Sequence, residues 1–492
     1  MSREMDLVSS FHFYQPPRGA EHKDLRGIQT SPDGIDYSEE VTKRCYSKLV
    51  RGGFGNMFGD FSYNMYPTLD VEFDRILAKP QQLGEGPQEF AERQAMIQTT
   101  REGMHAYLAE NGVGSIGIHT MIPDHKPRVY KRTLIRAGNE QFMRNSGGRS
   151  PRWLWNPELG WDIDTAEAAL DEGVEGLICA PWQVRLDSGA AADNQPVRLP
   201  LPSGRWIVAL PFSRRLHDAI SWGEDRWNAD NFADRYVMPA FDVAAANHNS
   251  HRLNVMVSDG ETLGGHDGTE GVDETLQYLL RVSLPERGVR PISINQLDLS
   301  DLPTGKLVER TAWSCEHGDL KRWKEPCDCH AHEASPEQLV WKVQFSQAHS
   351  ILSESVISAV RQQINMSDEE FIDVIGENFF NLLQNPGGSA SDAQKSALSA
   401  IPSSFAATTS CGTFFKTPAT SGYINMLLAA QSVYHLRDAG LVESSETIWN
   451  DYLQNMSQMT DPTSGKSGVE MVEDLLSGRL VTGRSTEMPF GA

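Results

Sequence analysis

The chain has 492 residues, of which 39% are hydrophobic and 22% are charged, so it holds enough apolar material for a substantial core. Its length predicts roughly two to four domains, or one barrel with a companion domain. The formal net charge of −22 argues against a nucleic acid or an anionic membrane as partner, because an acidic surface repels phosphate. We interpret this charge as a solubility feature that carries no information about function.

The N-terminal segment has no apolar signal core. No stretch of the chain approaches the roughly 18 apolar residues of a membrane-spanning helix. Six cysteines are too few for a disulfide scaffold in a chain of this length. We therefore expect a cytoplasmic protein with reduced thiols and no membrane partner.

Up to about residue 305, short β-type runs alternate with helical patterns. Most of these runs are almost continuously apolar, which is typical of parallel strands buried on both faces. Such alternation predicts βα units around a parallel sheet or barrel. The predicted helices include residues 88–110 and 165–172. The predicted strands are residues 7–12, 115–119, 152–155, 176–179, 206–210 and 254–257.

From Ser335 onward the pattern becomes helical. Ser335 followed by proline predicts a helix start, and residues 367–370 form a capping box that opens another helix. Residues 423–441 are predicted to form a third helix, ended by a glycine. The stretch 385–404 is rich in Gly, Ser and Pro and is predicted to be a loop.

These patterns divide the chain into three parts. Residues 1–305 are predicted to form the barrel, residues 306–334 a connecting segment with three of the six cysteines, and residues 335–492 an α-helical domain. We expect Phe414, Phe415 and the last predicted helix to pack against the barrel and to help close any site that forms there. Removal of the helical domain should therefore leave the protein insoluble or inactive.

Polar, titratable and aromatic residues recur where the predicted strands end. In a β/α barrel, catalytic groups sit on the loops at these C-terminal ends. Taken singly, a histidine there could be structural, and a carboxylate could stabilise a helix start or belong to a turn. Recurrence at five corresponding positions favours an active site. The five segments begin at His12, His119, Asn156, Ala180 and Ser258.

Two carboxylates in these segments, Glu158 and Asp259, suggest glycoside cleavage. That reaction needs one carboxylate to attack or stabilise the anomeric carbon and one carboxylic acid to protonate the leaving oxygen. The acid requires a raised pKa, which burial or a neighbouring charge supplies. Trp155, Trp161 and Trp182 would then line the site as platforms for sugar rings, the alternative being that they belong to the barrel core.

Four motifs follow one another along the chain: His12 with residues 15–17, His119 with residues 121–123, residues 153–158, and residues 258–264. They resemble, in order, the first four signature regions of glycoside hydrolase family 57. Four further stretches resemble a subgroup of family 57-like proteins with an additional C-terminal domain of unassigned function. These stretches are residues 61–69, 313–318, 322–329 and 409–415. The resemblance covers nearly the whole chain.

The resemblance implies an α/β fold, namely an incomplete (β/α)7 barrel of the glycoside hydrolase/deacetylase type with a C-terminal α-helical domain. It implies a retaining hydrolase or transglycosylase that acts on α-linked glucans, of the α-amylase, 4-α-glucanotransferase or branching-enzyme type, and that uses no cofactor. Matched motif by motif, Glu158 is the nucleophile and Asp259 the general acid/base. The residues expected to bind the α-glucan or oligosaccharide substrate are His12, Gln15, Asn64, His119, Trp155, Trp161, Trp182, Glu261 and His266.

Two features leave alternatives open within this assignment. Glu261 stands two residues after Asp259 on the same loop and is the rival acid. Family members commonly have a histidine, a leucine and an aromatic residue where this chain has Ser10, Asn156 and Thr413. These departures bear on the choice of substrate more than on the carboxylate pair.

A group of cysteines and histidines lies in the connecting segment. Soft ligands occur there at tight spacing, which suits zinc; they are Cys315, His317, Cys327 and Cys329, with His330 and His332 beside them. The usual C-x2-C spacing is missing, so we expect a reduced structural cluster without a metal, and a zinc site is the alternative. Any metal here is expected to be structural, because the sugar chemistry needs none.

Two other functions compete with the glycosidase hypothesis. A non-catalytic carbohydrate-binding or regulatory protein could use the same barrel, since a fold does not guarantee activity. Retention of both carboxylates argues against it. A metal-dependent carbohydrate deacetylase would need an Asp-His-His set of ligands, and no compact motif of that kind follows the early strands.

Overall fold

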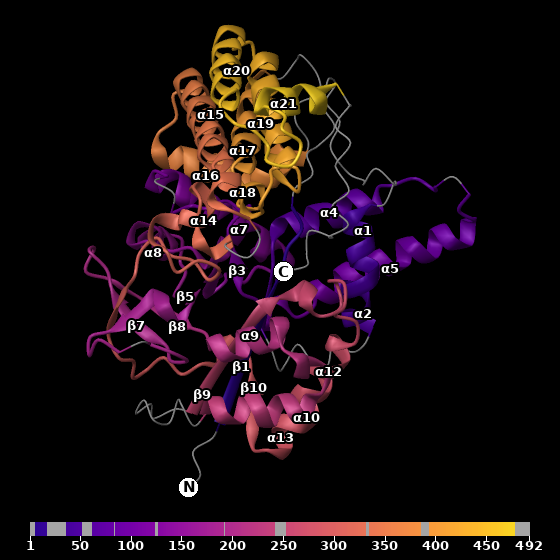
Figure 1. The fold of residues 1–492 in the computed structure, drawn as a ribbon, viewed down its shortest axis with the longest axis vertical. Helices are drawn as coiled ribbons and strands as arrows, with labels where there is room; N and C mark the ends of the chain where they lie inside the picture. Colours follow the sequence, from indigo (N-terminus) through magenta and orange to yellow (C-terminus); the bar gives the residue numbers. More distant parts are fainter. Residues whose placement is uncertain are drawn as a thin grey trace.

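Parallel strands lie at the centre of the N-terminal part of the molecule, and helices form its C-terminal part (Figure 1). A computed structural model of the protein describes residues 5–16, 36–51, 62–82, 84–123, 126–190, 192–241, 252–330, 334–384 and 393–477.

Seven parallel strands in the described part of the chain form the barrel. Their bounds are β1 Met5–Phe13, β2 Ser62–Met65, β3 Gly114–Ser115, β4 Trp153–Trp155, β5 Gly176–Cys179, β8 Trp206–Pro211 and β9 Arg252–Asp259. Strand β1 pairs with β2 and β9, and β3, β4, β5 and β8 pair in that order. A bridge between Tyr63 and Gly112 and a 2.8 Å hydrogen bond from Ser213 N to Val255 O join the two groups. The result is the predicted incomplete (β/α)7 barrel.

Four other strands extend this framework. Strand β10 pairs with the first half of β1 in parallel, β7 pairs with β8 in antiparallel, and β6 pairs with β11 in antiparallel. Their bounds are β6 Val184–Leu186, β7 Val197–Pro200, β10 Val289–Ile292 and β11 Gly305–Leu307.

Helices surround the barrel and follow its strands. They are α1 Tyr37–Val41, α2 Ser47–Leu49, α4 Pro67–Leu77, α5 Pro87–His105, α6 Leu108–Asn111, α7 Arg128–Asn145, α8 Ile163–Asp171, α9 Arg214–Trp222, α10 Ala229–Phe232, α12 Val272–Tyr278, α13 Leu284–Glu286 and α14 Lys321–Lys324. Local signals set several of their ends. For example, Asp162 caps α8 by accepting a 2.7 Å hydrogen bond from the backbone N–H of Thr165.

The C-terminal helices (orange to yellow in Figure 1) stand on the barrel. They are α15 Trp341–Ile364, α16 Asp368–Gln384, α17 Ala393–Ala406, α18 Cys411–Phe414, α19 Gly422–Asp438, α20 Val442–Met456 and α21 Gly468–Leu476. One continuous hydrophobic cluster joins Ile118 and Leu134 of the barrel to Phe345, Ile375 and Phe405 of these helices. The two parts therefore share a core.

Ion pairs also connect α7 to α16. Arg132 contacts Glu369 at 2.6 Å, and Arg136 contacts Asp373 at 3.0 Å. These pairs have exposed carboxylates, so they contribute little stability beside the shared apolar core.

The prediction of a loop at residues 385–404 is wrong over all of its described part, residues 393–404. Residues 385–392 lie outside the described residues, and helix α17 begins at Ala393. Ala397, Ala400 and Ile401 are almost fully buried at helical spacing. Their burial against the neighbouring helices outweighs the low helix propensity of the serines and of the internal proline.

The strand predicted at residues 115–119 ends early, because β3 stops at Ser115. The next residues bond elsewhere. Gly117 N donates to Leu134 O at 2.7 Å, and His119 O accepts from Ser410 N at 2.7 Å. Helix α7 and the helical domain thus take the place of a neighbouring strand.

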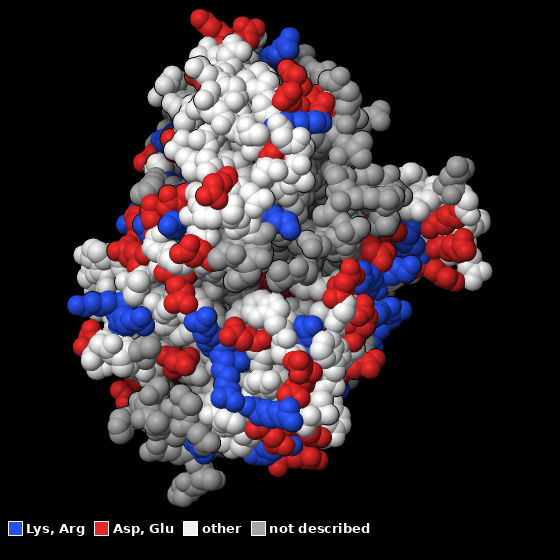
Figure 2. All heavy atoms as spheres, in the orientation of Figure 1, with Lys and Arg blue, Asp and Glu red and all other residues white. Residues whose placement is uncertain are grey.

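Figure 2 shows acidic and basic side chains interspersed over the barrel half of the visible face. Among the described residues, no helix has the length and apolar character that crossing a membrane requires.

Candidate active site

Glu158 lies in a strained turn directly after β4. Its φ is 55° and that of Leu159 is 47°, a left-handed conformation that costs roughly 1–2 kcal/mol for each residue with a side chain. The backbone N–H of Leu159 bonds to Asn156 O at 2.9 Å, and Trp313 N bonds to Glu158 O at 2.9 Å. Strain of this kind persists where the surroundings fix it, commonly at functional sites.

The Glu158 carboxylate is held by three donors from two distant segments. Its Oε2 accepts from Trp313 Nε1 at 3.0 Å and from Ser314 Oγ at 3.2 Å. Its Oε1 accepts from Ser410 Oγ at 3.3 Å. Burial raises the pKa of Glu158, and the bond from Trp313 and the charge of Arg322 oppose that rise.

Asp259 and His12 end neighbouring strands and form an ion pair. They are register partners in β9 and β1, and His12 Nε2 contacts Asp259 Oδ1. Burial alone would raise the pKa of Asp259, but His12 lowers it to about 2. Burial would likewise lower the pKa of His12, yet Asp259 raises it above its ordinary value. Near neutral pH the proton of this pair therefore resides on the imidazole.

The two groups differ in their access to solvent. The side chain of Asp259 is 43% exposed, whereas that of His12 is 8% exposed. Asp259 is thus the member of the pair that a ligand can reach.

Glu261 is a second carboxyl group beside this pair. Its Oε1 accepts hydrogen bonds from Tyr46 Oη and, at 3.3 Å, from Tyr14 N. Burial raises the pKa of Glu261 to about 7, although His12 and Tyr46 oppose the rise. Glu261 and Asp259 are thus two neighbouring carboxyl groups whose environments push their pKa values apart, the arrangement that acid/base chemistry uses.

Gly260 allows these two carboxyl groups to stand so close. A Cβ at this position would lie 2.2 Å from the ring of Phe13, so only glycine fits between Asp259 and Glu261 without moving β1.

His119 is the neutral member of the site. Its Nδ1 lies 2.7 Å from Ser410 Oγ, and its ring lies 4.3 Å from that of Tyr14 and 5.0 Å from that of Tyr66 between centroids. Burial, and secondly the charge of His12, lower the pKa of His119 to about 3. The predicted pair of histidines is brought together, with 6.2 Å between the ring centroids.

The predicted tryptophans have different positions. Trp155 packs 4.9 Å from His12 and 5.4 Å from Trp313 between centroids; it is as fully buried as Trp161, so it supports the site through packing and has no exposed face for a sugar. Trp182 is partly buried and lies under the guanidinium of Arg214. Trp161 does not face the site: it is fully buried, and its Nε1 donates to Ile178 O at 2.8 Å. It belongs to the barrel core and offers no face to a sugar in this structure.

The remaining predicted binding residues lie near these groups. Gln15 is buried, and its Nε2 donates to Tyr46 Oη at 3.2 Å, so it supports Tyr46. His266 is close enough to Asp259 for that carboxylate to raise its pKa, although burial dominates and lowers it. Asn64 is the register partner of His12 in β2, and its side chain lies outside the described residues.

Sequence reasoning gave no role at the site to the donors of Glu158 and Glu261. Trp313, Ser314 and Ser410 lie in stretches that resemble the family 57-like subgroup. That resemblance is the sequence signal from which a role at the site could have been predicted. Tyr46 lies in no recognised motif, because only the folded chain brings it to Glu261.

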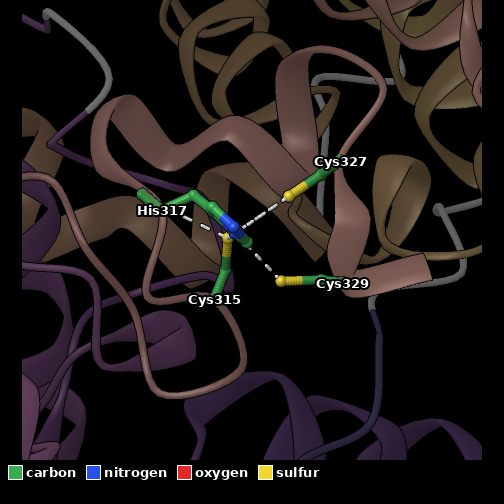
Figure 3. A group of neighbouring side chains, drawn as sticks. All are labelled: Cys315, His317, Cys327 and Cys329. Carbon is green, nitrogen blue, oxygen red and sulfur yellow. Dashed lines mark hydrogen bonds between the residues drawn. The ribbon is translucent and has the colours of Figure 1, made fainter. Parts of the chain in front are cut away.

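The Cys/His group of the connecting segment is a separate cluster (Figure 3). Ligand atoms of Cys315, His317, Cys327 and Cys329 all lie within 4.8 Å of one another. His332 and the side chain of His330 lie outside the described residues. Within the described chain, no other set of three or more His, Cys, Asp or Glu residues gathers closely enough to hold a metal, so the Asp-His-His arrangement of a deacetylase is not formed by them.

Several solved structures resemble nearly the whole chain. An exo-type maltose-forming amylase from Pyrococcus sp. ST04 matches with a TM-score of 0.66 and 14% identity, over 97% of this chain and 88% of that one. A GH57 branching enzyme from Thermococcus kodakaraensis matches with a TM-score of 0.56 and 12% identity, over 99% and 96%. The chain has the fold of GH57 enzymes.

The α-amylase AmyC from Thermotoga maritima matches with a TM-score of 0.53 and 14% identity, over 96% of this chain and 99% of that one. These matches confirm the predicted fold class, including the presence of a helical C-terminal region. No protein-family model and no curated protein matches the chain.

Proposed function

We propose that the protein cleaves α-linked glucans with retention of the anomeric configuration, and passes the sugar to water or to a second glucan. The observation that carries this proposal is the placement of Glu158: a buried carboxylate with three hydrogen-bond donors, beside the His12–Asp259 pair. The structural neighbours are a maltose-forming amylase, a branching enzyme and an α-amylase, which supports an α-glucan as the substrate.

Glu158 acts as the nucleophile. Three hydrogen bonds stabilise its ionised form against the cost of burial. One oxygen attacks the anomeric carbon, the bond to the leaving oxygen breaks, and a covalent glycosyl ester forms. Water or a glucan hydroxyl then displaces Glu158.

Asp259 acts as the acid/base, because it is the carboxyl group of the pair that solvent reaches. A sugar that covers Asp259 removes water from its carboxylate, which raises the pKa of that group toward the value an acid requires. In the second step the same carboxylate takes the proton of the incoming water or hydroxyl. His12 Nε2 holds the carboxylate in place throughout.

A glucan panel with product analysis tests this proposal. We expect amylose or maltooligosaccharides to be shortened or redistributed in length, and β-linked glucans of the same size to remain intact. Glu158→Gln is the matched control and should abolish the conversion. Failure to convert any α-glucan, or conversion that Glu158→Gln leaves unchanged, would overturn the proposal.

A further inference from the structure

We propose that Cys315, His317, Cys327 and Cys329 bind one structural zinc ion. The four side chains come from two ends of a short loop segment and point toward a common centre (Figure 3). Three thiolates and one imidazole are a ligand set that zinc takes in structural sites. The proposed sugar chemistry needs no metal ion, so metal binding stands apart from the proposed function.

Four of the six distances between the ligand atoms match a tetrahedron around zinc, and the two between Cys329 Sγ and the other sulfurs are at most 4.8 Å. With Zn–S near 2.3 Å and Zn–N near 2.0–2.1 Å, tetrahedral edges measure about 3.7–3.8 Å between sulfurs and about 3.5–3.6 Å between sulfur and nitrogen. The Sγ atoms of Cys315 and Cys327 are 3.7 Å apart. His317 Nδ1 lies 3.6, 3.3 and 3.4 Å from Cys315, Cys327 and Cys329 Sγ, respectively.

Hydrogen bonding within the cluster does not account for this arrangement. The Nδ1 of an imidazole carries either one hydrogen or one lone pair, yet His317 Nδ1 faces three sulfurs at similar distances. Thiols are weak donors and acceptors, so three such contacts to one nitrogen gain little energy. A cation at the centre would contact all four ligand atoms at once.

The surroundings suit a closed structural site. Cys315 and Cys327 are buried in a small apolar cluster with Met121, Leu320 and Trp323. His317 is exposed and covers the outer side. Four protein ligands fill the coordination sphere and leave no position for a substrate or a reactive water.

The site would stabilise a segment that has little regular structure. Asp319 and Leu320 have φ values of 64° and 56°, and the nearby helix α14 has only four residues. Left-handed residues cost free energy, and metal coordination offsets that cost by closing the loop between Cys315 and Cys327.

Zinc in this place would also position two donors of the nucleophile. Trp313 and Ser314 directly precede Cys315 and bond to Glu158 Oε2, and Arg322 Nη1 donates to Ser314 O at 3.2 Å. This positioning role rests on the proposed function, whereas metal binding does not.

Metal analysis of the full-length protein tests the proposal. We expect about one zinc ion per chain in protein purified without chelator. Replacement of zinc by Co²⁺ should give the strong visible d–d bands and the thiolate-to-metal charge-transfer band of a tetrahedral thiolate site. Cys315→Ser and the milder, half-buried Cys329→Ser should each lose most of the bound metal. Cys179→Ala, which changes a buried cysteine of β5, should retain it.

Four results would overturn the proposal. They are metal-free protein that fails to take up added Zn²⁺ although all six thiols react after denaturation, protein with a Cys315–Cys327 disulfide, protein with iron in place of zinc, and unchanged zinc content in both serine variants. The metal content of the unsubstituted protein is decisive even where a variant fails to fold.

Discussion

Ser410 Oγ donates a hydrogen bond to Glu158 Oε1 across 3.3 Å, although 252 positions separate the two residues in the chain. The same hydroxyl lies 2.7 Å from His119 Nδ1. Since a hydroxyl has a single hydrogen, the consistent arrangement is that His119 Nδ1–H donates to Ser410, and Ser410 donates to Glu158. The helical domain thus contributes directly to the candidate active site.

Ser410→Ala should lower turnover about 10- to 100-fold, because a hydrogen bond to a charged group contributes roughly 1.5–3 kcal/mol. The melting temperature should change little. Ser399→Ala is the matched control, since Ser399 is a fully buried serine of the same domain whose hydroxyl has no hydrogen-bond partner. Equal turnover in the two variants would show that Ser410 does not act on Glu158.

Truncation after Ala334 should give an insoluble or inactive protein. It removes Ser410 from the site and exposes the barrel face that shares a core with Phe345, Ile375 and Phe405. Soluble expression, circular dichroism and turnover check this. A truncated protein that stays folded and fully active would mean that the helical domain is an independent appendage.

Local patterns predicted the helix starts and the buried strands. The capping box at residues 367–370 forms as expected, with reciprocal bonds between Ser367 and Glu370. Strand β5 has the predicted bounds. Helix α17 escaped prediction because its stability comes from burial of Ala397, Ala400 and Ile401 against other helices, which composition does not reveal.

The positions of site residues were predictable only where strand order sets them. Asp259 and His12 meet because β9 and β1 are neighbours in register. Trp161 also follows a strand, but position along the chain does not determine which side a ring faces, and its Nε1 bonds to Ile178 O inside the core. Ser410 reaches Glu158 through packing of the helical domain, and no local pattern encodes that contact.

Glu261→Gln should change how stability depends on pH. Burial raises the folded-state pKa of Glu261 to about 7 from an ordinary value of 4.5. The stability contributed by its proton is therefore fully present below about pH 4.5 and is lost as the pH rises through about 7. Because the amide does not ionise, Glu261→Gln should gain stability relative to the unsubstituted protein across this window.

Urea unfolding at a series of pH values measures that difference. The free energy of unfolding of the variant minus that of the unsubstituted protein should increase from acidic to neutral pH. A difference that is constant with pH would mean that Glu261 keeps an ordinary pKa in the folded state.

Asp259→Asn should impair natural glucans most. An activated aryl α-glucoside needs little protonation of its leaving group, so its first step should be relatively spared. Glu261→Gln is the comparison variant, because the pKa of Glu261 is raised whereas that of Asp259 is lowered. If Glu261→Gln shows the leaving-group dependence and Asp259→Asn behaves like the unsubstituted protein, Glu261 is the acid.

The central claim is that Glu158 attacks the anomeric carbon, and azide rescue of Glu158→Ala tests it most directly. The alanine variant lacks the nucleophile, so turnover of an activated α-glucoside should fall by several orders of magnitude while circular dichroism stays unchanged. Azide fits the space left by the carboxylate and should restore turnover, giving the inverted β-glycosyl azide. The same experiment on Asp259→Ala should give the retained α-glycosyl azide, because azide then attacks the glycosyl ester of Glu158. Unchanged turnover of Glu158→Ala without azide, or a retained azide product from this variant, would contradict the account.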